Sequence, residues 1–431
     1  MSMVMVNLAM LVSAQSATNS PYSQYGLGVL ADQSGGANRG MNGLGIGFHE
    51  HNQINFINPA SYSSVDSLTF ILDAGFSGQF TNYSEGGVKI NAKNSNFEYV
   101  TAAFRLRKNL GFSFGILPYT NIGYQYSNTE KLNPGDNNAS QVAYNNTYSG
   151  SGGSHQVYVG AGWSPFKDFS VGANISYLWG EYDRSVVNSY SDGYVNTLSR
   201  YYHAEVRNYK LDFGVQYTQR ISKNDELTFG LTFSPGHNLK ADPDCKVIST
   251  NSQTGVADTT VYSLNNGLEI PSTYGVGVMW HHDKSLKVGL DYQLQTWSKA
   301  VYPKYVTGKD GQPDSYEISN DAYSDRHKLT IGADYCPVER SRRFFKRMHY
   351  RFGASYATSY LKINGHDGPK EYSVSAGVAM PIVNAYNNRS MLNLSVQWVR
   401  QDSKMFITEN SFRINIGLTF NEKWFAKWKM E

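Results

Sequence analysis

The stretch NPASYSSVDSLTFILDAGF, residues 58–76, contains the start of a regular alternation between two kinds of side chain. From position 68 onward one face carries Leu, Phe, Leu, Ala and Phe, and the other carries Thr69, Ile71, Asp73 and Gly75. Successive side chains of a β-strand point to opposite faces, so this pattern predicts a strand that begins near residue 67. The preceding small and polar residues do not alternate, which predicts a different structure for residues 15–66.

The same alternation recurs along the rest of the chain. In residues 286–295, for example, Leu, Val, Leu, Tyr and Leu alternate with Lys, Gly, Asp, Gln and Gln. Short connections such as 107–110 and 222–225 alternate with long polar ones at 81–96, 128–153, 183–200, 235–269 and 298–322. The count is about fourteen strands, with predicted starts near residues 67, 97, 110, 155, 169, 203, 226, 272, 286, 326, 349, 371, 390 and 409.

Turn lengths distinguish the two folds that such alternation allows. A soluble sandwich also alternates, but only a membrane barrel requires short turns at one end and long ones at the other. No window holds the roughly 20 consecutive apolar residues of a membrane helix, and a closed barrel is the other way to satisfy every backbone group in lipid. The sequence therefore predicts an all-β fold, a transmembrane antiparallel β-barrel of about 14 strands.

Composition agrees with a barrel and excludes some partners. Aromatic residues make up 14% of the 431 residues and charged residues only 17%. The net charge of +3 is small and evenly spread, so no nucleic acid partner is expected. Cys245 and Cys336 fall in connections of opposite ends and are expected to stay unpaired.

The two ends of the chain are expected to lie outside the barrel wall. Residues 1–14 combine an apolar run with a small-residue cleavage pattern, which predicts a signal peptide cut after Ala14. The predicted organisation is a signal peptide (1–14), an N-terminal hatch inside the lumen (15–66), a β-barrel (67–420) and a periplasmic C-terminal tail (421–431). A barrel of fourteen strands is too wide for side chains alone to fill, so a compact segment rich in glycine is a suitable plug.

Two short motifs resemble a known family. A run with Gly40, Gly43 and Gly45, followed by Asn58-Pro59-Ala60 just before the first strand, resembles the N-terminal hatch of FadL-type outer-membrane transporters. The resemblance implies a bacterial outer-membrane barrel, in contact with membrane lipids and lipopolysaccharide, that takes up a hydrophobic small molecule. The style of both chain ends is similar to that of barrels from Bacteroidetes-type bacteria.

In that family the substrate is thought to leave sideways, at an inward kink of the third strand. The third strand here reads GFSFGILPYTNIGY, in which Gly115 and Pro118 mark a bend and a missing backbone donor. We therefore expect a lateral gate at these two residues. The carbonyl freed near Pro118 needs a partner in lipid, and the Asn58 amide is the expected donor.

The predicted inner faces favour an alternative. They are mostly small, polar or charged, whereas a conduit for a hydrophobic molecule should be apolar. The alternative is a non-transporting barrel, a subunit or scaffold of an outer-membrane protein secretion or barrel-assembly complex. Its inward charges would form a lumen network that holds the hatch: Asp73, Lys210, Asp212, Asp291, Lys328, Asp334, Arg351 and Arg413.

Other motifs carry weaker signals. His49-Glu50-His51 has the form of half a zinc site, but a polar segment facing water explains it equally well and no third ligand is indicated. No pattern of nucleophile and base or of paired carboxylates is present, so we expect neither an enzyme nor a cofactor. The basic run 339–348, ERSRRFFKRM, reads either as a solvated turn or as a site for a partner or anionic headgroups.

Overall fold

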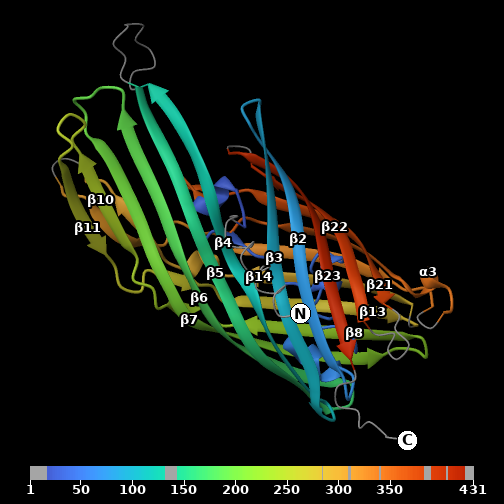
Figure 1. Ribbon diagram of the computed structural model, residues 1–431. Helices are drawn as coiled ribbons and strands as arrows, with labels where there is room; N and C mark the ends of the chain where they lie inside the picture. The colour runs from blue at the N-terminus through green and yellow to red at the C-terminus, as the bar shows by residue number, and fades with distance from the viewer. Residues whose placement is uncertain are drawn as a thin grey trace, which may run out of the picture.

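The computed structural model describes residues 17–131, 143–283, 285–308, 312–338, 341–382, 390–403 and 406–422. Fourteen antiparallel strands form a closed barrel, in which the last strand pairs with the first from Phe70↔Glu422 to Ser84↔Thr408 (Figure 1). This confirms the predicted all-β antiparallel barrel and its strand number. The strands are β2 (Phe70–Glu85), β3 (Val88–Arg107), β4 (Leu110–Lys131), β5 (Ala143–Phe166), β6 (Phe169–Tyr190), β7 (Thr197–Arg220), β8 (Asp225–Ser234), β13 (Thr273–His282), β14 (Leu286–Gln295), β17 (Arg326–Tyr335), β18 (His349–Ala357), β21 (Lys370–Ile382), β22 (Ser390–Asp402) and β23 (Thr408–Glu422).

Several strands are longer than the alternation predicts. β3 begins at residue 88, β5 at 143 and β7 at 197, inside stretches expected to be long loops. There both faces of each strand are polar or exposed, so the apolar alternation ends while the backbone ladder continues. These extensions form a tall wall at β4 to β7, whose strands have 22 to 24 residues, against 10 in β8 (Figure 1).

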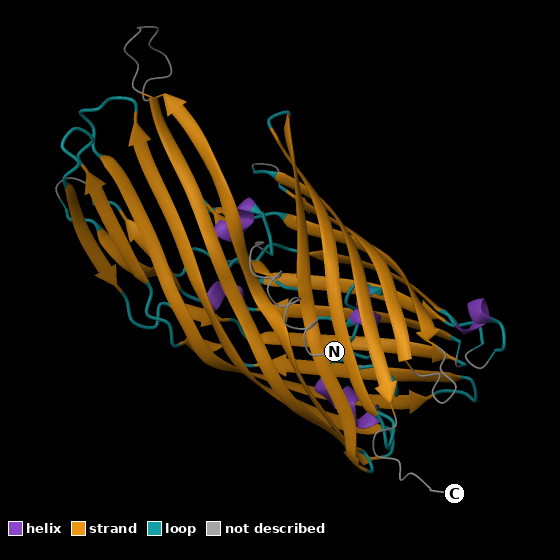
Figure 2. Cartoon of the chain, viewed as in Figure 1, coloured by secondary structure: helices purple, strands orange, loops and turns teal. Residues whose placement is uncertain are grey.

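The long connections on the tall side have structure of their own (Figure 2). β10 (Asp244–Thr250) pairs with β7 and widens the wall, and β11 (Ala257–Ser263) pairs with β10. The other small elements are β9 (His237–Leu239), β12 (Leu268–Ile270), η3 (Trp297–Lys299), β15 (Tyr302–Val306), β16 (Ser315–Ser319), α3 (Phe344–Arg347), β19 (Lys362–Ile363) and β20 (His366–Asp367). Cys245 lies in β10 rather than in a loop, and the prediction that Cys245 and Cys336 are not joined by a disulfide is confirmed.

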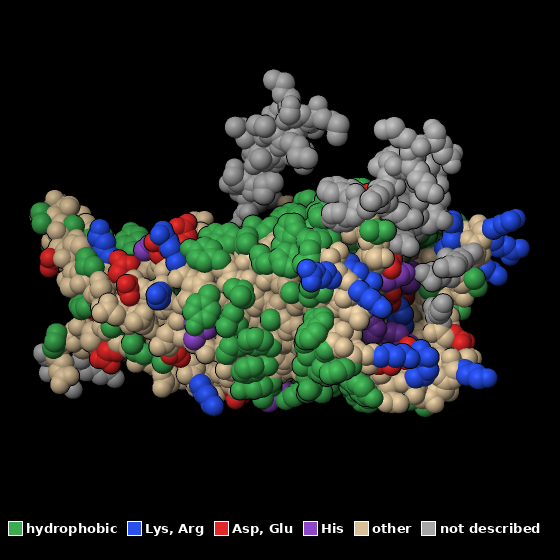
Figure 3. Space-filling view, turned by 90° about the horizontal axis from the view of Figure 1, so that it is seen from below, with side chains coloured by type: hydrophobic (Ala, Val, Ile, Leu, Met, Phe, Trp, Pro, Cys, Tyr) green, Lys and Arg blue, Asp and Glu red, His purple; other side chains and the backbone are tan. Residues whose placement is uncertain are grey.

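The outer surface of the barrel is apolar. Large hydrophobic side chains stay exposed on alternate positions of the strands, such as Phe76 and Phe80 on β2 or Ile414 and Ile416 on β23. Figure 3 shows hydrophobic side chains gathered over the middle of one side of the molecule, with most charged ones towards its two ends. No helix in the described part of the chain is long and apolar enough to cross a membrane.

The N-terminal segment, residues 17–69, lies inside the barrel and is mostly buried (Figure 1). It contains η1 (Pro21–Gln24), β1 (Val29–Leu30), α2 (Gly36–Arg39) and η2 (Pro59–Ser64). The first barrel strand starts at Phe70, and β23 continues to Glu422 instead of ending at Phe420. The predicted cleavage after Ala14 and residues 423–431 of the predicted tail lie outside the described residues.

A belt of inward-facing glycines receives this segment. A Cβ on Gly111 would overlap the Tyr62 carbonyl, and one on Gly162 would lie 2.5 Å from the Pro59 oxygen. Many of these glycines face one another across neighbouring strands, as do Gly162 and Gly172. The glycine belt comprises Gly111, Gly162, Gly172, Gly214, Gly230, Gly277, Gly289, Gly332, Gly353, Gly377 and Gly417. Without side chains there, the segment's backbone packs directly on the wall.

Candidate functional site

The third barrel strand separates from the second at the predicted bend. Pairing of β3 with β4 runs from the turn to Val100↔Ile116, and no pair joins them beyond it in the described residues. Gly115 lies one position before this last pair, where a Cβ would meet the β3 backbone. At Pro118 the pairing of β4 with β5 shifts register, which marks a bulge. Gly115 and Pro118 thus flank the point where the wall opens.

The N-terminal segment covers the freed edge of β4. In β1, Val29 pairs with Asn121 and Leu30 with Thr120. The Gln33 side chain donates to the Pro118 carbonyl at 2.6 Å. A backbone group near the bend therefore does take its partner from the segment inside the barrel.

The prediction that the Asn58 amide donates to the carbonyl freed near Pro118 was wrong. The amide nitrogen of Asn58 donates to the carbonyls of Ile46 at 2.8 Å and Val215 at 3.2 Å, on the β7 side of the barrel. Its oxygen accepts from the Ala60 N–H at 3.1 Å, so Asn58 caps the η2 turn that Pro59 begins. The missing Cβ of Gly214 leaves the space that this side chain occupies, and that fixes Asn58 away from Pro118.

The edge of β3 is held by the beginning of the same segment. The Asn96 side chain donates to the Ala17 carbonyl at 2.9 Å, and Asn19 donates to Asn94 at 3.2 Å. Residues 17–33 therefore contact both strands that border the opening. These residues bridge the gap between β3 and β4 by side-chain contacts and by the two-residue pairing of β1 with β4, where a continuous sheet would have paired the two strands directly.

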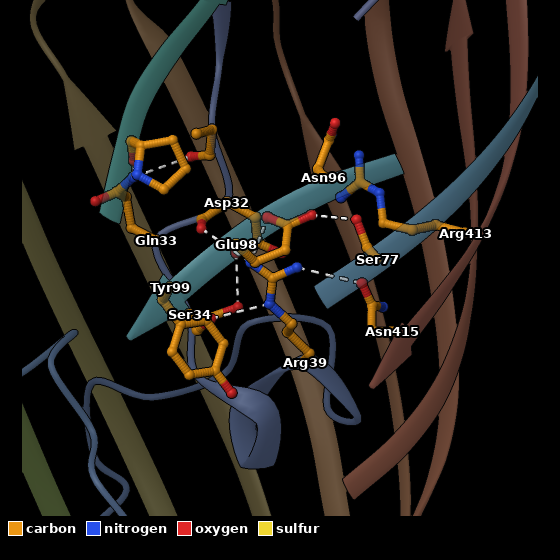
Figure 4. A network of polar contacts seen from close by, with 12 residues as sticks. Asp32, Gln33, Ser34, Arg39, Ser77, Asn96, Glu98, Tyr99, Arg413 and Asn415 are labelled. Carbon is orange, nitrogen blue, oxygen red and sulfur yellow. Dashed lines mark hydrogen bonds and ion pairs between the residues drawn. The ribbon is translucent and has the colours of Figure 1, made fainter. Parts of the chain in front are cut away.

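A buried arginine lies at the centre of the polar network below this bridge (Figure 4). Arg39, at the end of α2, is 3% exposed and forms an ion pair with Glu98 of β3 at 2.9 Å. It also donates to the Ser34 carbonyl at 3.0 Å and to Asn415 of β23 at 3.2 Å. Burial alone would raise the pKa of Asp32, but the positive charges of Arg39 and Lys328 hold it below the usual value. Sequence reasoning missed Arg39 and Glu98, because neither has a local motif.

The predicted lumen charges do not form one network. Asp334 and Arg351 pair at 3.0 Å, and Arg351 reaches Asn393 at 2.7 Å. Asp291 accepts from the N–H groups of residues 45 and 46 at 2.7 and 2.8 Å, so it holds the N-terminal segment directly. Asp73 accepts from Thr419 at 3.1 Å.

Three of the remaining predicted charges, Lys210, Asp212 and Arg413, bind partners on the wall, whereas the charge of Lys328 acts on Asp32 of the N-terminal segment. Asp212 pairs with Lys210, and Arg413 donates to Gln79 at 2.8 Å. Both border the cavity described below.

The predicted glycines of the segment lie against the wall opposite the opening. A Cβ on Gly40 would lie 3.0 Å from Arg351, and one on Gly45 would collide with Ile57. Gly43 has a φ of +85°, which favours glycine. These positions serve close packing and a turn.

His49 stacks on His281 with ring centroids 5.7 Å apart, and neighbouring Glu50 pairs with Lys287. Burial, followed by the charges of His281 and Lys287, lowers the pKa of His49 to about 3. No group of three side chains that could hold a metal ion occurs in the part of the chain that the structure describes.

A polar cavity of about 270 Å³ remains between the N-terminal segment and inward-facing side chains of strands all around the barrel. Charged and amide side chains line much of it, among them Gln33, Glu98, Lys210, Lys328, Glu409 and Arg413. A packed apolar cluster lies towards the long-connection end. There the rings of Trp297 and Tyr360 meet at a tilt with centroids 4.7 Å apart, and Tyr22 and Leu27 of the N-terminal segment join the cluster. The described lumen therefore contains a charged chamber capped by a hydrophobic core.

The family model of BamG matches residues 1–431, the whole length of the chain. The chain belongs to the BamG family. Among curated proteins no sequence matches it.

Several solved structures share the fold of this BamG family member. The Ralstonia pickettii toluene transporter TbuX is 13% identical with a TM-score of 0.61, over 90% of this chain and 98% of that chain. The P. putida toluene transporter TodX is 11% identical with a TM-score of 0.59, over 92% and 100%. A Pseudomonas aeruginosa FadL homologue is 11% identical with a TM-score of 0.56, over 92% and 99%. The fold is thus that of FadL-type barrels, in agreement with the resemblance seen in the sequence.

Proposed function

We propose that this protein is a non-transporting barrel of the bacterial outer membrane that serves as a subunit or scaffold of a protein secretion or barrel-assembly complex. The observation that carries the proposal is the filled lumen. The N-terminal segment packs on the glycine belt, and the chamber that remains is lined by charges. A hydrophobic solute in that chamber would displace water from ionised groups, which is costly.

The outer surface supports placement in a membrane. Exposed large hydrophobic side chains recur on the outward parity of the strands, whereas buried charges such as Asp73 and Arg351 lie on the inward parity. Proteins in water rarely expose a continuous apolar surface of this extent, whereas the outer face of a membrane barrel requires one. In this proposal residues 17–66 act as a permanent hatch.

The test is gentle detergent extraction from native membranes, followed by mass spectrometry of what copurifies. We expect other outer-membrane proteins in constant ratio to this chain. Recovery of the chain alone, together with uptake of an aromatic hydrocarbon by liposomes that contain it, would refute the scaffold.

A second function, uptake of a hydrophobic small molecule with lateral release, is favoured by one specific observation. In the described residues β3 and β4 do not pair with each other beyond Val100↔Ile116, at the strand position predicted for a side opening. Two of the similar solved structures are toluene transporters. On this proposal Gly115 and Pro118 form the gate, and residues 17–33 must move aside for release.

Pro118→Val tests the gate. Valine restores a backbone donor and relaxes the bend, so uptake of a hydrophobic probe should fall while the amount of folded barrel stays constant. Pro381→Val, in a strand remote from the opening, is the matched control. Equal uptake by both variants would count against lateral release.

A further inference from the structure

A basic and aromatic turn projects from the short-turn end of the barrel. Residues 336–348 join β17 to β18, and the part 341–348 contains α3, which stands beyond the ends of the strands (Figure 1). Neither proposed function accounts for this turn.

The turn carries an unbalanced positive charge. Its sequence SRRFFKRM has four cations and no carboxylate. No ion pair joins any of the four to a carboxylate in the described residues, and Arg347 Nε is buried without a hydrogen-bond partner there. The buried Arg39 inside the barrel, by contrast, is paired with Glu98. Among the described residues, therefore, no carboxylate competes with an anionic ligand for the four cations.

Two phenylalanines accompany the cations in exposed positions. Phe345 is 72% exposed and Phe344 is 41% exposed, and their rings meet edge to face. The backbone of the turn is held by bonds from Val338 N to the Lys346 oxygen and from Ser341 N to the Val338 oxygen. These hydrogen bonds fix the backbone in a conformation that leaves both rings exposed.

The turn is fixed beside the outer surface of the barrel. The Tyr350 hydroxyl donates to the Phe345 carbonyl at 3.1 Å. Tyr350 has the same parity on β18 as Phe352, which is 59% exposed, and the opposite parity to the buried Arg351. Its cross-strand neighbour Tyr335 is also exposed. The turn therefore lies at the edge of the apolar surface and away from the lumen.

We propose that residues 341–348 form a binding site for anionic phospholipid headgroups at the short-turn end of the barrel. The guanidinium and ammonium groups of the turn bind the headgroup phosphates, and the phenylalanine rings enter the boundary between headgroups and acyl chains. Charge complementarity and the continuity with the apolar surface favour this occupant over an acidic protein. The proposal rests on membrane placement, which both proposed functions share.

The test uses the full barrel in detergent, with phosphatidylglycerol and phosphatidylcholine added in equal amounts and the bound lipids counted by native mass spectrometry. The wild type should retain phosphatidylglycerol in preference. Each basic residue near an anionic surface is worth about fivefold in binding, so removal of all four should reduce the preference by at least about tenfold. The variant combines Arg342→Gln, Arg343→Gln, Lys346→Gln and Arg347→Gln.

The matched control removes four exposed cations at the opposite end and should keep the wild-type preference. It combines Lys89→Gln, Lys93→Gln, Lys131→Gln and Lys246→Gln. A separate variant, Phe344→Ser with Phe345→Ser, keeps the charge and should weaken retention of both lipids. Mobility of unheated samples on gels confirms that each barrel is folded.

The other outcomes overturn the proposal. Equal loss in the variant and the control would show that net charge alone acts. Absence of any preference in the wild type, or cross-links from position 345 to an acidic protein in place of lipid, would exclude the headgroup site. Insertion into phosphatidylcholine nanodiscs, measured in parallel, reports on membrane placement itself.

Discussion

Replacement of Gly172 by alanine should displace the η2 turn from the barrel wall. The new Cβ would lie 2.6 Å from the Ala60 nitrogen and closer still to the backbone of Pro59. These are backbone atoms, so no side chain can rotate to make room. Either β6 bends outward or residues 59–64 move inward, and the short turn is the softer element.

Overpacking a well-packed site costs about 1–3 kcal/mol. If the docked state alone bears a cost of about 2 kcal/mol, the population with η2 released should rise about 30-fold. Gly78→Ala is the matched control, because a Cβ at that position meets nothing within 4 Å.

The assay measures release through a reporter thiol at Ser61, which is 4% exposed when the turn is docked. Both native cysteines are first replaced by serine, and Ser61→Cys is then labelled with a maleimide in the reconstituted barrel. The labelling rate should rise about 30-fold in the Gly172→Ala variant and stay unchanged in the control. Equal rates in the two variants, with the barrel folded in both, would refute the docking of η2 on the glycine belt.

Two further predictions concern the polar contacts of the N-terminal segment. Arg39→Gln and Glu98→Gln should each reduce the free energy of unfolding in lipid by about 3–5 kcal/mol, because each leaves a buried partner without its counter-charge. The double variant should lose clearly less than the sum of the two single losses. Additive losses in a urea titration would contradict the ion pair. Because the docked His49 has a pKa of about 3 and a released one titrates near 6.5, release should become easier by up to about 1.4 kcal/mol per pH unit as the pH falls below 6.5. Hydrogen exchange of residues 45–57, corrected for intrinsic rates, should show weaker protection of these amides at pH 5 than at pH 7. The His49→Gln variant should show a smaller difference between the two pH values. An equal difference in that variant would assign the effect to His281 instead.

The strands could be predicted because their signal is local. A barrel strand has lipid on one side and the lumen on the other, so every second residue must be apolar wherever the wall crosses the membrane. Residues 286–295 show this completely, and β14 has these bounds. The apolar alternation ends where the strands extend beyond the apolar band, so the predicted starts of β3 and β5 lie later in the chain than the observed ones.

For side chains inside the lumen, the sequence predicted that they are buried but not which groups they bind. Inward parity identified Asp291 and Arg351 as buried charges, but not which groups they bind. Asp291 holds backbone groups 245 and 246 positions earlier, and Ser20 reaches Glu409 across 389 positions. Such contacts depend on how the barrel closes and where the segment enters, which no local pattern encodes.

The sequence by itself determined the strand number, the two faces of each strand and the bend at Gly115 and Pro118, since each follows from residues close together in the chain. Only the tertiary structure decided that Gln33 and not Asn58 binds near Pro118, that Arg39 pairs with Glu98, and that glycines of eleven strands meet in one belt. The physical reason is register. The stagger between strands sets the height of every side chain in the lumen, and it is fixed when the whole barrel closes around the segment that fills it.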